Sequence, residues 1–279
     1  MRDGLRERGW TEGRNLQIVW RWAGGDMVHF RDYATELVGL APELIFAVGT
    51  SSVAMLKQAT HSIPIIFAIV NDPVAQGFIC SMGHPGGNIT GFSFLEYSAV
   101  GKSLELLKQA APHVTRIAVM FNPETYPYYN IFLRSFERTA PSISVELISA
   151  EIRSRADIDE TITKLAEQRG TGLLSAPDPF TSVHRDAIIT STARHRMPAI
   201  YAFRQYVQEG GLMSYGADPV DIIRRAGSYI DLVLKGANPG ELPAQQPTKF
   251  EFAINLRTAH ALDLTVPNDL LTAADEVIE

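Results

Sequence analysis

Short apolar runs alternate with amphipathic stretches along almost the whole chain. Apolar runs such as residues 65–70 and 117–121 are continuous, which is typical of strands covered on both faces. The amphipathic stretches have the periodicity of helices with one face turned toward a core. The alternation predicts an α/β fold in which parallel sheets are covered by crossover helices.

The boundaries of the predicted elements follow from this pattern and from its turn signals. The pairs Asp178-Pro179 and Asp218-Pro219 are typical helix starts, and Gly236 is a typical helix end. The predicted strands occupy residues 16–20, 44–48, 65–70, 89–92, 117–121, 144–149, 172–176, 199–202, 211–215 and 250–254. The predicted helices occupy residues 30–40, 51–59, 98–111, 129–139, 155–168, 183–194 and 218–234.

Length and composition point to two folded domains. The strand and helix pattern runs through two successive rounds with a break near residue 95, and 279 residues are near the limit for a single core. With 46% hydrophobic and 20% charged residues, the composition is that of an ordinary globular protein.

Charge, cysteine content and hydropathy exclude several classes of protein. A formal net charge of -6 disfavours nucleic acid as a partner, because phosphate binding needs a concentrated basic surface. The single cysteine, Cys80, excludes an internal disulfide, and its apolar neighbours predict that it is buried. No apolar run is long enough to insert into a membrane.

The reactive motifs that we searched for do not occur in the sequence. A nucleophile elbow, a glycine-rich dinucleotide loop, a phosphate-binding loop and a His-Glu-x-x-His pair are all missing. We therefore expect no catalytic residue, no cofactor and no metal. An enzyme on a doubly wound fold remains an alternative, because fold alone does not exclude one.

Polar and aromatic side chains follow the predicted strands, where open parallel sheets bind ligands. We expect one cleft to be lined by Thr50, Ser51, Asn71, Asp72, Ser93, Asn122, Asp178, Phe203, Arg204, Tyr215 and Asp218. In this interpretation Thr50 and Ser51 begin a helix and favour an anion. Asp72 or Asp218 balances an ammonium group, and Arg204 clamps a carboxylate.

A structural role for the three aspartates stays open beside this one. Asp72, Asp178 and Asp218 each stand beside a proline, a position where aspartate commonly caps a turn or a helix.

Several stretches together resemble ABC-transporter substrate-binding proteins of the family that includes tryptophan-binding members. They are residues 63–77 (IPIIFAIVNDPVAQG), 85–91 (PGGNITG), 197–201 (MPAIY), 210–216 (GGLMSYG), 234–239 (LKGANP) and 246–252 (QPTKFEF). The resemblance covers essentially the whole chain. It implies a type I periplasmic-binding-protein fold, in which two doubly wound parallel-sheet lobes are joined by three crossovers with the ligand between them.

The resemblance also implies where the lobes and hinges lie. Residues 1–94 and 216–240 form the first lobe, and residues 95–215 and 241–279 form the second. Hinges are expected near residues 91–94, 215–216 and 245–248. In the resembling family a strand precedes the helix that begins here at Met1, so the first strand of the first lobe is expected to be missing from this chain.

The function that the resemblance implies is capture of a small molecule for an ABC uptake transporter. The ligand is expected to be an amino acid, an aromatic acid or another small carboxylate, and hinge closure to hold it. The further partner is the membrane permease of the transporter, and the location is periplasmic or extracellular and membrane-associated, although no signal peptide stands in this sequence. The alternative is a cytoplasmic ligand-sensing domain of the same fold.

Overall fold

A computed structural model describes residues 1–94, 97–127, 129–136 and 139–279. The chain divides into two compact units: unit 1 is Met1–Leu95 with Asp218–Lys249, and unit 2 is Glu96–Ala217 with Phe250–Glu279. The chain thus passes from one unit to the other three times. Residues 241–249, which the resemblance placed in the second lobe, group with unit 1, because Gln245 is hydrogen-bonded to Gly91 and Ser93.

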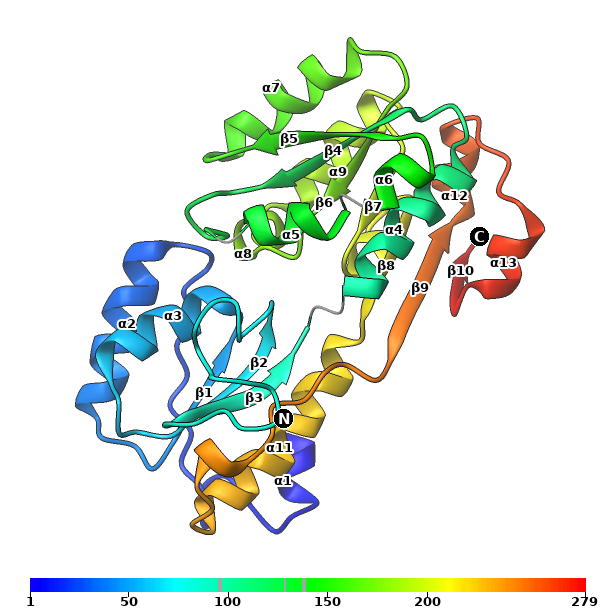
Figure 1. Cartoon of the computed structure of the whole chain (residues 1–279). Coiled ribbons are helices and arrows are strands. Elements are labelled where there is room, and N and C mark those ends of the chain that lie inside the picture. The colour runs from blue at the N-terminus through cyan, green and yellow to red at the C-terminus, as the bar shows by residue number, and fades with distance from the viewer. Residues whose placement is uncertain (95–96, 128, 137–138) are drawn as a thin grey trace. The chain divides into compact units, whose positions relative to one another are not determined.

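Unit 1 contains a three-stranded parallel sheet in the order β1-β2-β3. Its elements in chain order are α1 (Arg2–Arg6), α2 (Met27–Gly39), β1 (Ile45–Val48), α3 (Thr50–Ala59), β2 (Ile65–Val70), β3 (Ile89–Ser93), α11 (Pro219–Leu234) and the short 3-10 helix η1 (Pro239–Glu241). In Figure 1 they are the blue and cyan segments, the gold helix α11 and the orange turn that follows it.

The core of unit 1 lies on both faces of this sheet. Alternate strand residues point to opposite faces, so Ile65 and Phe67 pack with Val53 of α3 on one side. On the other side, Phe92 of β3 meets Tyr229 of α11, with ring centroids 4.8 Å apart. Helix α11 therefore covers the face opposite α2 and α3, and this two-sided cover explains why the strands read as continuous apolar runs.

The strand predicted at residues 16–20 is wrong. In the structure this segment makes only an isolated bridge between Glu12 and Leu16, and β1 pairs with β2 alone among the described residues. Val19 is 44% exposed and Trp22 78% exposed, so their side chains are not packed in a core. An extended segment becomes a strand only when its backbone groups pair with a neighbour, and this segment joins no sheet in the part of the chain that the structure describes.

Unit 2 is built on a seven-stranded sheet with the order β10-β9-β8-β7-β6-β4-β5. Its elements are α4 (Tyr97–Ala110), β4 (Arg116–Phe121), α5 (Tyr129–Phe136), α6 (Thr139–Ser142), β5 (Glu146–Glu151), α7 (Arg155–Ala166), β6 (Thr171–Ser175), α8 (Pro179–Val183), α9 (Arg185–Arg194), β7 (Ala199–Tyr201), α10 (Arg204–Gln208), β8 (Met213–Ala217), β9 (Phe250–Asn255), α12 (Leu256–Ala261), α13 (Asn268–Ala273) and β10 (Glu276–Ile278). Strands β4 to β8 are parallel and follow the order of a doubly wound sheet.

One pair of strands in unit 2 departs from the parallel arrangement that the sequence predicted. Strand β9 runs antiparallel to β8, with Ala217 opposite Phe250. The chain leaves unit 2 at the end of β8 and re-enters it at the start of β9. Because the chain leaves unit 2 along β8 and returns along the neighbouring β9, the two strands point in opposite directions.

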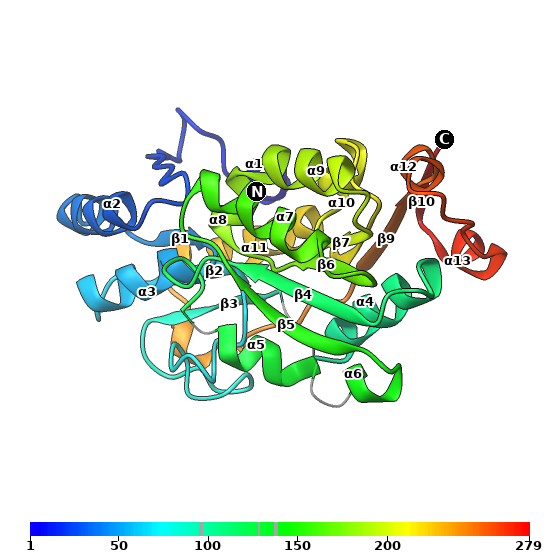
Figure 2. The same ribbon diagram turned by 90° about the horizontal axis from the view of Figure 1, so that it is seen from above.

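Helices cover both faces of the sheet of unit 2, as Figure 2 shows for α7 and α9 on one side and α4, α5 and α6 on the other. Ile158 and Ile162 of α7 and Ile188 of α9 are fully buried against strand residues such as Met120 and Tyr201. This double cover confirms the α/β class that the apolar runs predicted.

Most other predicted elements agree with the structure to within about two residues at each end, which is the usual uncertainty of such boundaries. The predicted helix 129–139 spans residues 137–138, which lie outside the described residues. The prediction that Cys80 is buried is wrong: Cys80 is exposed, because its neighbours Phe78 and Ile79 take the buried places in that loop.

Candidate functional site

The first cluster of predicted site residues lies at the carboxyl ends of β1 and β2 in unit 1. Gly49 has φ 85°, which lets the chain turn sharply from β1 into α3. Thr50 and Ser51 follow it and are buried, at 4% and 2% exposure. The backbone N–H of Asn71 donates to the Thr50 hydroxyl at 3.3 Å, so the two strand ends are joined directly.

The N-terminus of α3 has the polarity that suits an anion. Its N-cap is Gly49, which has no side chain to fold over the first turn. The unbonded N–H groups of a first helical turn carry partial positive charge, which favours a carboxylate or phosphate. The hydroxyl groups of Thr50 and Ser51 stand in this first turn.

Asp72 follows directly and has an unusual backbone conformation. Its φ is 41°, in the left-handed region that aspartate and asparagine tolerate better than most residues. Its carboxylate accepts the backbone N–H of Ala75 at 3.0 Å and so caps the turn that follows β2. The structure therefore shows a capping contact for Asp72, a half-buried residue that directly follows Asn71.

Ser93, at the end of β3, is joined to a different segment. Its backbone N–H and its hydroxyl both donate to the carbonyl of Gln245, at 2.8 Å and 3.3 Å. The structure thus places Ser93 against the segment that leads back to unit 2.

In unit 2, Asp178 organises the ends of β4 and β6. Its carboxylate is 1% exposed and accepts the backbone N–H groups of Asn122 at 2.8 Å and Phe180 at 3.1 Å. The hydroxyl of Thr125 donates to it as well. Asp178 thereby caps α8 and fixes the loop that carries Asn122, so the capping alternative holds for this residue.

The surroundings of Asp178 shift its protonation. Burial raises the pKa of the carboxyl group to about 6, and the hydrogen bonds from Thr125, Asn122 and Phe180 oppose this rise only in part. Sequence reasoning missed Thr125, although a hydroxyl shortly after Asn122-Pro123 could have indicated a turn held by side chains.

The pKa of Asp178 predicts a pH dependence of stability. Between about pH 6 and pH 3.8 the Asp178 carboxyl is protonated in the folded state but ionised in the unfolded chain. Because the folded state binds the extra proton, the free energy of unfolding rises as the pH falls through this window. Relative to Asp178→Asn, the free energy of unfolding of the wild type should increase by about 1 kcal/mol per pH unit between pH 6 and pH 4. Denaturant titrations of both proteins at several pH values measure the difference, and a pH-independent difference would contradict the prediction.

The other predicted residues of unit 2 have partners of their own. Arg204 lies 3.3 Å from the Glu251 carboxylate of β9, and its side chain is 46% exposed. Phe203 is half-buried against the core of unit 2. Tyr215 stacks on Phe250 at 6.0 Å between ring centroids.

Asp218 belongs to unit 1 and forms both a helix cap and an ion pair. Its carboxylate accepts the backbone N–H groups of Val220 and Asp221 at the start of α11, and Lys249 Nζ lies 2.7 Å from its other oxygen. Burial raises the pKa of Asp218, but the bonds from Lys249 and the two N–H groups outweigh it, and the pKa lies below its ordinary value. A positive partner for Asp218 is therefore already present within unit 1.

The structure brings the predicted residues together in separate groups. In unit 1, Thr50, Ser51, Asn71 and Asp72 form one cluster, while Ser93 and Asp218 each bind a segment near a crossing. In unit 2, Asn122 and Asp178 are bonded to each other. Within the described ranges, no helix is long and apolar enough to span a bilayer, and no three His, Cys, Asp or Glu side chains are grouped to hold a metal ion.

Two α/β units linked by three crossings, with polar side chains at the carboxyl ends of the strands, define a protein of the type I periplasmic-binding-protein class. Over residues 1–278 the chain matches the family of ABC transporter substrate binding proteins, and it belongs to that family.

Known relatives agree with this assignment. The chain is 29% identical over 261 residues to a tyrosine-binding protein of Clostridioides difficile (strain R20291), which covers 93% of this chain and 74% of the relative. A crystal structure of a conserved domain protein from Vibrio cholerae matches with a TM-score of 0.92 and 28% identity, covering 99% of this chain and 92% of the other. The ABC domain in complex with L-Trp from Streptococcus pneumonia also matches with a TM-score of 0.92, at 25% identity and the same coverage.

Proposed function

We propose that this protein is the ligand-capturing component of an ABC uptake system and that it binds an aromatic amino acid by closure of its two units. The observation that carries the proposal is the family match over residues 1–278, together with relatives described as binding tyrosine and L-Trp. A ligand that contacts both units binds the closed arrangement more tightly than the open one. This difference in affinity stabilises the closed arrangement and so captures the ligand.

The charges in unit 1 support an amino acid as the ligand. The start of α3, with Thr50 and Ser51, offers N–H and hydroxyl donors for the α-carboxylate. Asp72 stands at the neighbouring strand end and offers a carboxylate for the ammonium group. Asp218 is engaged by Lys249, so we assign the ammonium contact to Asp72.

The residues predicted in unit 2 fit the remainder of an aromatic amino acid. Tyr215 and Phe203 supply aromatic rings, and Asn122 supplies an amide that Asp178 holds in place through the backbone. Arg204 is balanced by Glu251, and the proposal gives it no contact with the α-carboxylate.

The family assignment also supports a location and a partner. Substrate-binding proteins of ABC importers act outside the cytoplasmic membrane and deliver the ligand to a permease. We propose the same place and the same kind of partner for this chain.

Binding should depend on both charges of the amino acid. L-tyrosine or L-tryptophan at about one hundred times its Kd should stabilise the protein by about 2.7 kcal/mol, seen as a raised melting temperature. Tyramine, which lacks the carboxylate, and 3-(4-hydroxyphenyl)propionate, which lacks the ammonium group, should each produce a much smaller rise. Equal shifts with tyramine would overturn the carboxylate assignment, and no shift with any aromatic amino acid would overturn the ligand class.

The assignment of Asp72 is tested by a variant of that residue, with calorimetry as the measurement. Asp72→Asn removes the charge but suits the backbone φ of 41°, and it should weaken L-tyrosine binding at least about tenfold, the value of a lost charge-assisted hydrogen bond. Asp263→Asn is the matched control, because Asp263 is an exposed aspartate with φ 56° in unit 2. Calorimetry showing equal Kd values for the two variants would remove Asp72 from the site.

A further inference from the structure

Hydrogen bonds join the segments of unit 1 that lead to its three crossings into unit 2. The first follows β3, the second lies between Ala217 and Asp218, and the third lies between Lys249 and Phe250. The backbone N–H of Asp218 donates to the Lys249 carbonyl at 3.0 Å, which continues the pairing of β8 with β9. The segment before the third crossing also pairs with β3, since the N–H of Gln245 donates to Gly91.

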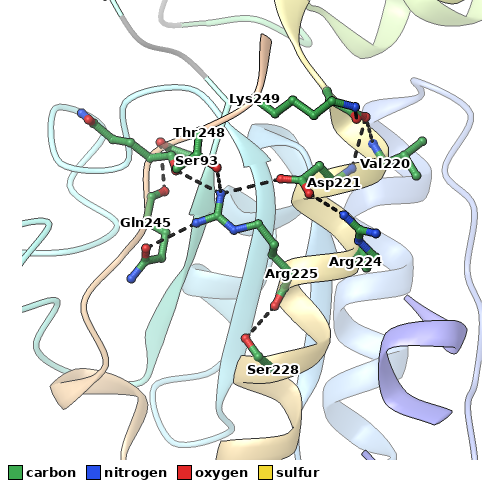
Figure 3. A network of polar contacts seen from close by, with 11 residues as sticks. Ser93, Val220, Asp221, Arg224, Arg225, Ser228, Gln245, Thr248 and Lys249 are labelled. Atoms are coloured by element: carbon green, nitrogen blue, oxygen red, sulfur yellow. Dashed lines mark hydrogen bonds and ion pairs between the residues drawn. The ribbon is translucent and has the colours of Figure 1, made fainter. Parts of the chain in front are cut away.

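One side chain contacts the segments that lead to these crossings. Arg225 projects from α11, the helix that starts directly after the second crossing (Figure 3). Its guanidinium donates to the Thr248 hydroxyl at 3.0 Å and to the Gln246 carbonyl and the Gln245 side chain at 3.4 Å each. These contacts hold the segment before the third crossing.

The same guanidinium reaches the root of the first crossing. Its central carbon lies 5.2 Å from the centroid of the Phe92 ring, a cation–π contact on β3. Toward the second crossing, Arg225 lies 3.9 Å from the carboxylate of Asp221, whose own N–H is bound by Asp218. The Arg225 side chain is 26% exposed, so these contacts are partly shielded from water.

The contacts around Gln245 extend this arrangement. The side-chain oxygen of Gln245 accepts a hydrogen bond from Arg225, and its side-chain nitrogen donates to the Tyr229 hydroxyl at 2.9 Å. Tyr229 in turn donates to the Pro243 carbonyl at 2.6 Å. Two side chains of α11 thus fix one segment of the connecting chain at several points.

We propose that Arg225 is a positioning residue of the hinge, which fixes the directions in which the connecting segments leave unit 1 and so limits the motion between the units without ligand. The planar guanidinium has five N–H donors in a fixed fork, which suits three acceptors on one segment together with an aromatic ring nearby. A lysine at this position keeps the charge and loses this geometry. The inference rests on the proposed function only in taking motion between the units as the working motion.

The test measures that motion without any ligand. Nitroxide labels at Gln58→Cys and Glu167→Cys, in a Cys80→Ser background, place one exposed probe on each unit for electron–electron distance measurements. Arg225→Lys should broaden the distance distribution between the units. Arg224→Lys is the matched control: Arg224 is the adjacent residue, pairs with the same Asp221 and is 62% exposed, and its exchange should leave the distribution unchanged.

A second variant keeps the test decisive if Arg225→Lys does not fold. Thr248→Val removes one acceptor of Arg225 from the connecting segment and leaves α11 intact, so it should broaden the distribution in the same direction but less. In the double variant, Thr248→Val should add little to Arg225→Lys, because the contact is already lost. Distributions as narrow as the wild type in both single variants would overturn the proposal, as would fully additive broadening in the double variant.

Binding of L-tyrosine separates this inference from the proposed function. If the wild type binds L-tyrosine, Arg225→Lys should raise its Kd, because a wider range of open arrangements must be given up on closure. If the wild type does not bind L-tyrosine, the proposed ligand fails, while the ligand-free distance distributions still decide the role of Arg225.

Discussion

Alanine at position 91 is expected to lower the free energy of unfolding of unit 1 by about 3 kcal/mol or more. Gly91 lies in β3, opposite Phe67 of the central strand β2. A Cβ atom at Gly91 would lie 2.1 Å from the Phe67 carbonyl oxygen and 2.6 Å from its nitrogen. Both are backbone atoms of the fully buried Phe67, so the overlap is relieved only by parting the two strands.

Tryptophan fluorescence reports this effect selectively. All three tryptophans of the chain lie in unit 1, and the indole N–H of Trp10 donates to Asp231 of α11 at 2.8 Å. Denaturant unfolding followed by fluorescence therefore measures unit 1, while far-ultraviolet circular dichroism also follows unit 2. Gly83→Ala is the control, because Gly83 is exposed and nothing lies within 4 Å of its added Cβ. Equal midpoints for the two variants would refute the steric argument.

Much of the fold could be predicted from the sequence because the two periodicities are local properties. The strand at residues 65–70 agrees with β2 at both ends, and the helix at 155–168 agrees with the start of α7. Apolar runs identify buried strands regardless of what they pair with. The same reasoning failed at residues 16–20, since strand formation there depended on a partner elsewhere in the chain.

The direction of β9 could not be predicted for a related reason. Its apolar pattern is that of the other strands, and only the route of the chain from β8 through α11 makes it antiparallel. The connection between distant segments, rather than the residues of the strand, decides this feature.

The candidate site was predicted in its positions but not in its partners. The predicted residues lie at or near the carboxyl ends of strands, because that rule follows from the topology, and their contact with a ligand stays a prediction. Their contacts join residues far apart in sequence: 31 positions separate Asp218 from Lys249, and 47 separate Arg204 from Glu251. No local pattern indicates such pairs, so sequence reasoning left charges available to a ligand that the protein itself neutralises.

Asp178 shows the largest consequence of such a distant contact. Its partner Asn122 is 56 positions away, and the bond joins the ends of β4 and β6. Asp178→Ala should leave the N–H groups of Asn122 and Phe180 and the Thr125 hydroxyl without their acceptor. Each buried donor without a partner costs about 1 to 3 kcal/mol, partly offset by the removal of a buried charge.

We expect Asp178→Ala to lower the free energy of unfolding of unit 2 by about 3 kcal/mol or more, with hydrogen exchange at Asn122 and Phe180 accelerated. Because the tryptophans lie in unit 1, the change should appear in the circular dichroism of unit 2 and leave the fluorescence transition of unit 1 in place. Asp186→Ala is the matched control: Asp186 is in unit 2 too, but its carboxylate is 60% exposed and pairs with Arg155 at the surface, where such pairs contribute about 1 kcal/mol at most. If Asp178→Ala proves no more costly than Asp186→Ala, the Asp178 carboxylate does not hold the two strand ends together, and the loop carrying Asn122 must be fixed by other contacts.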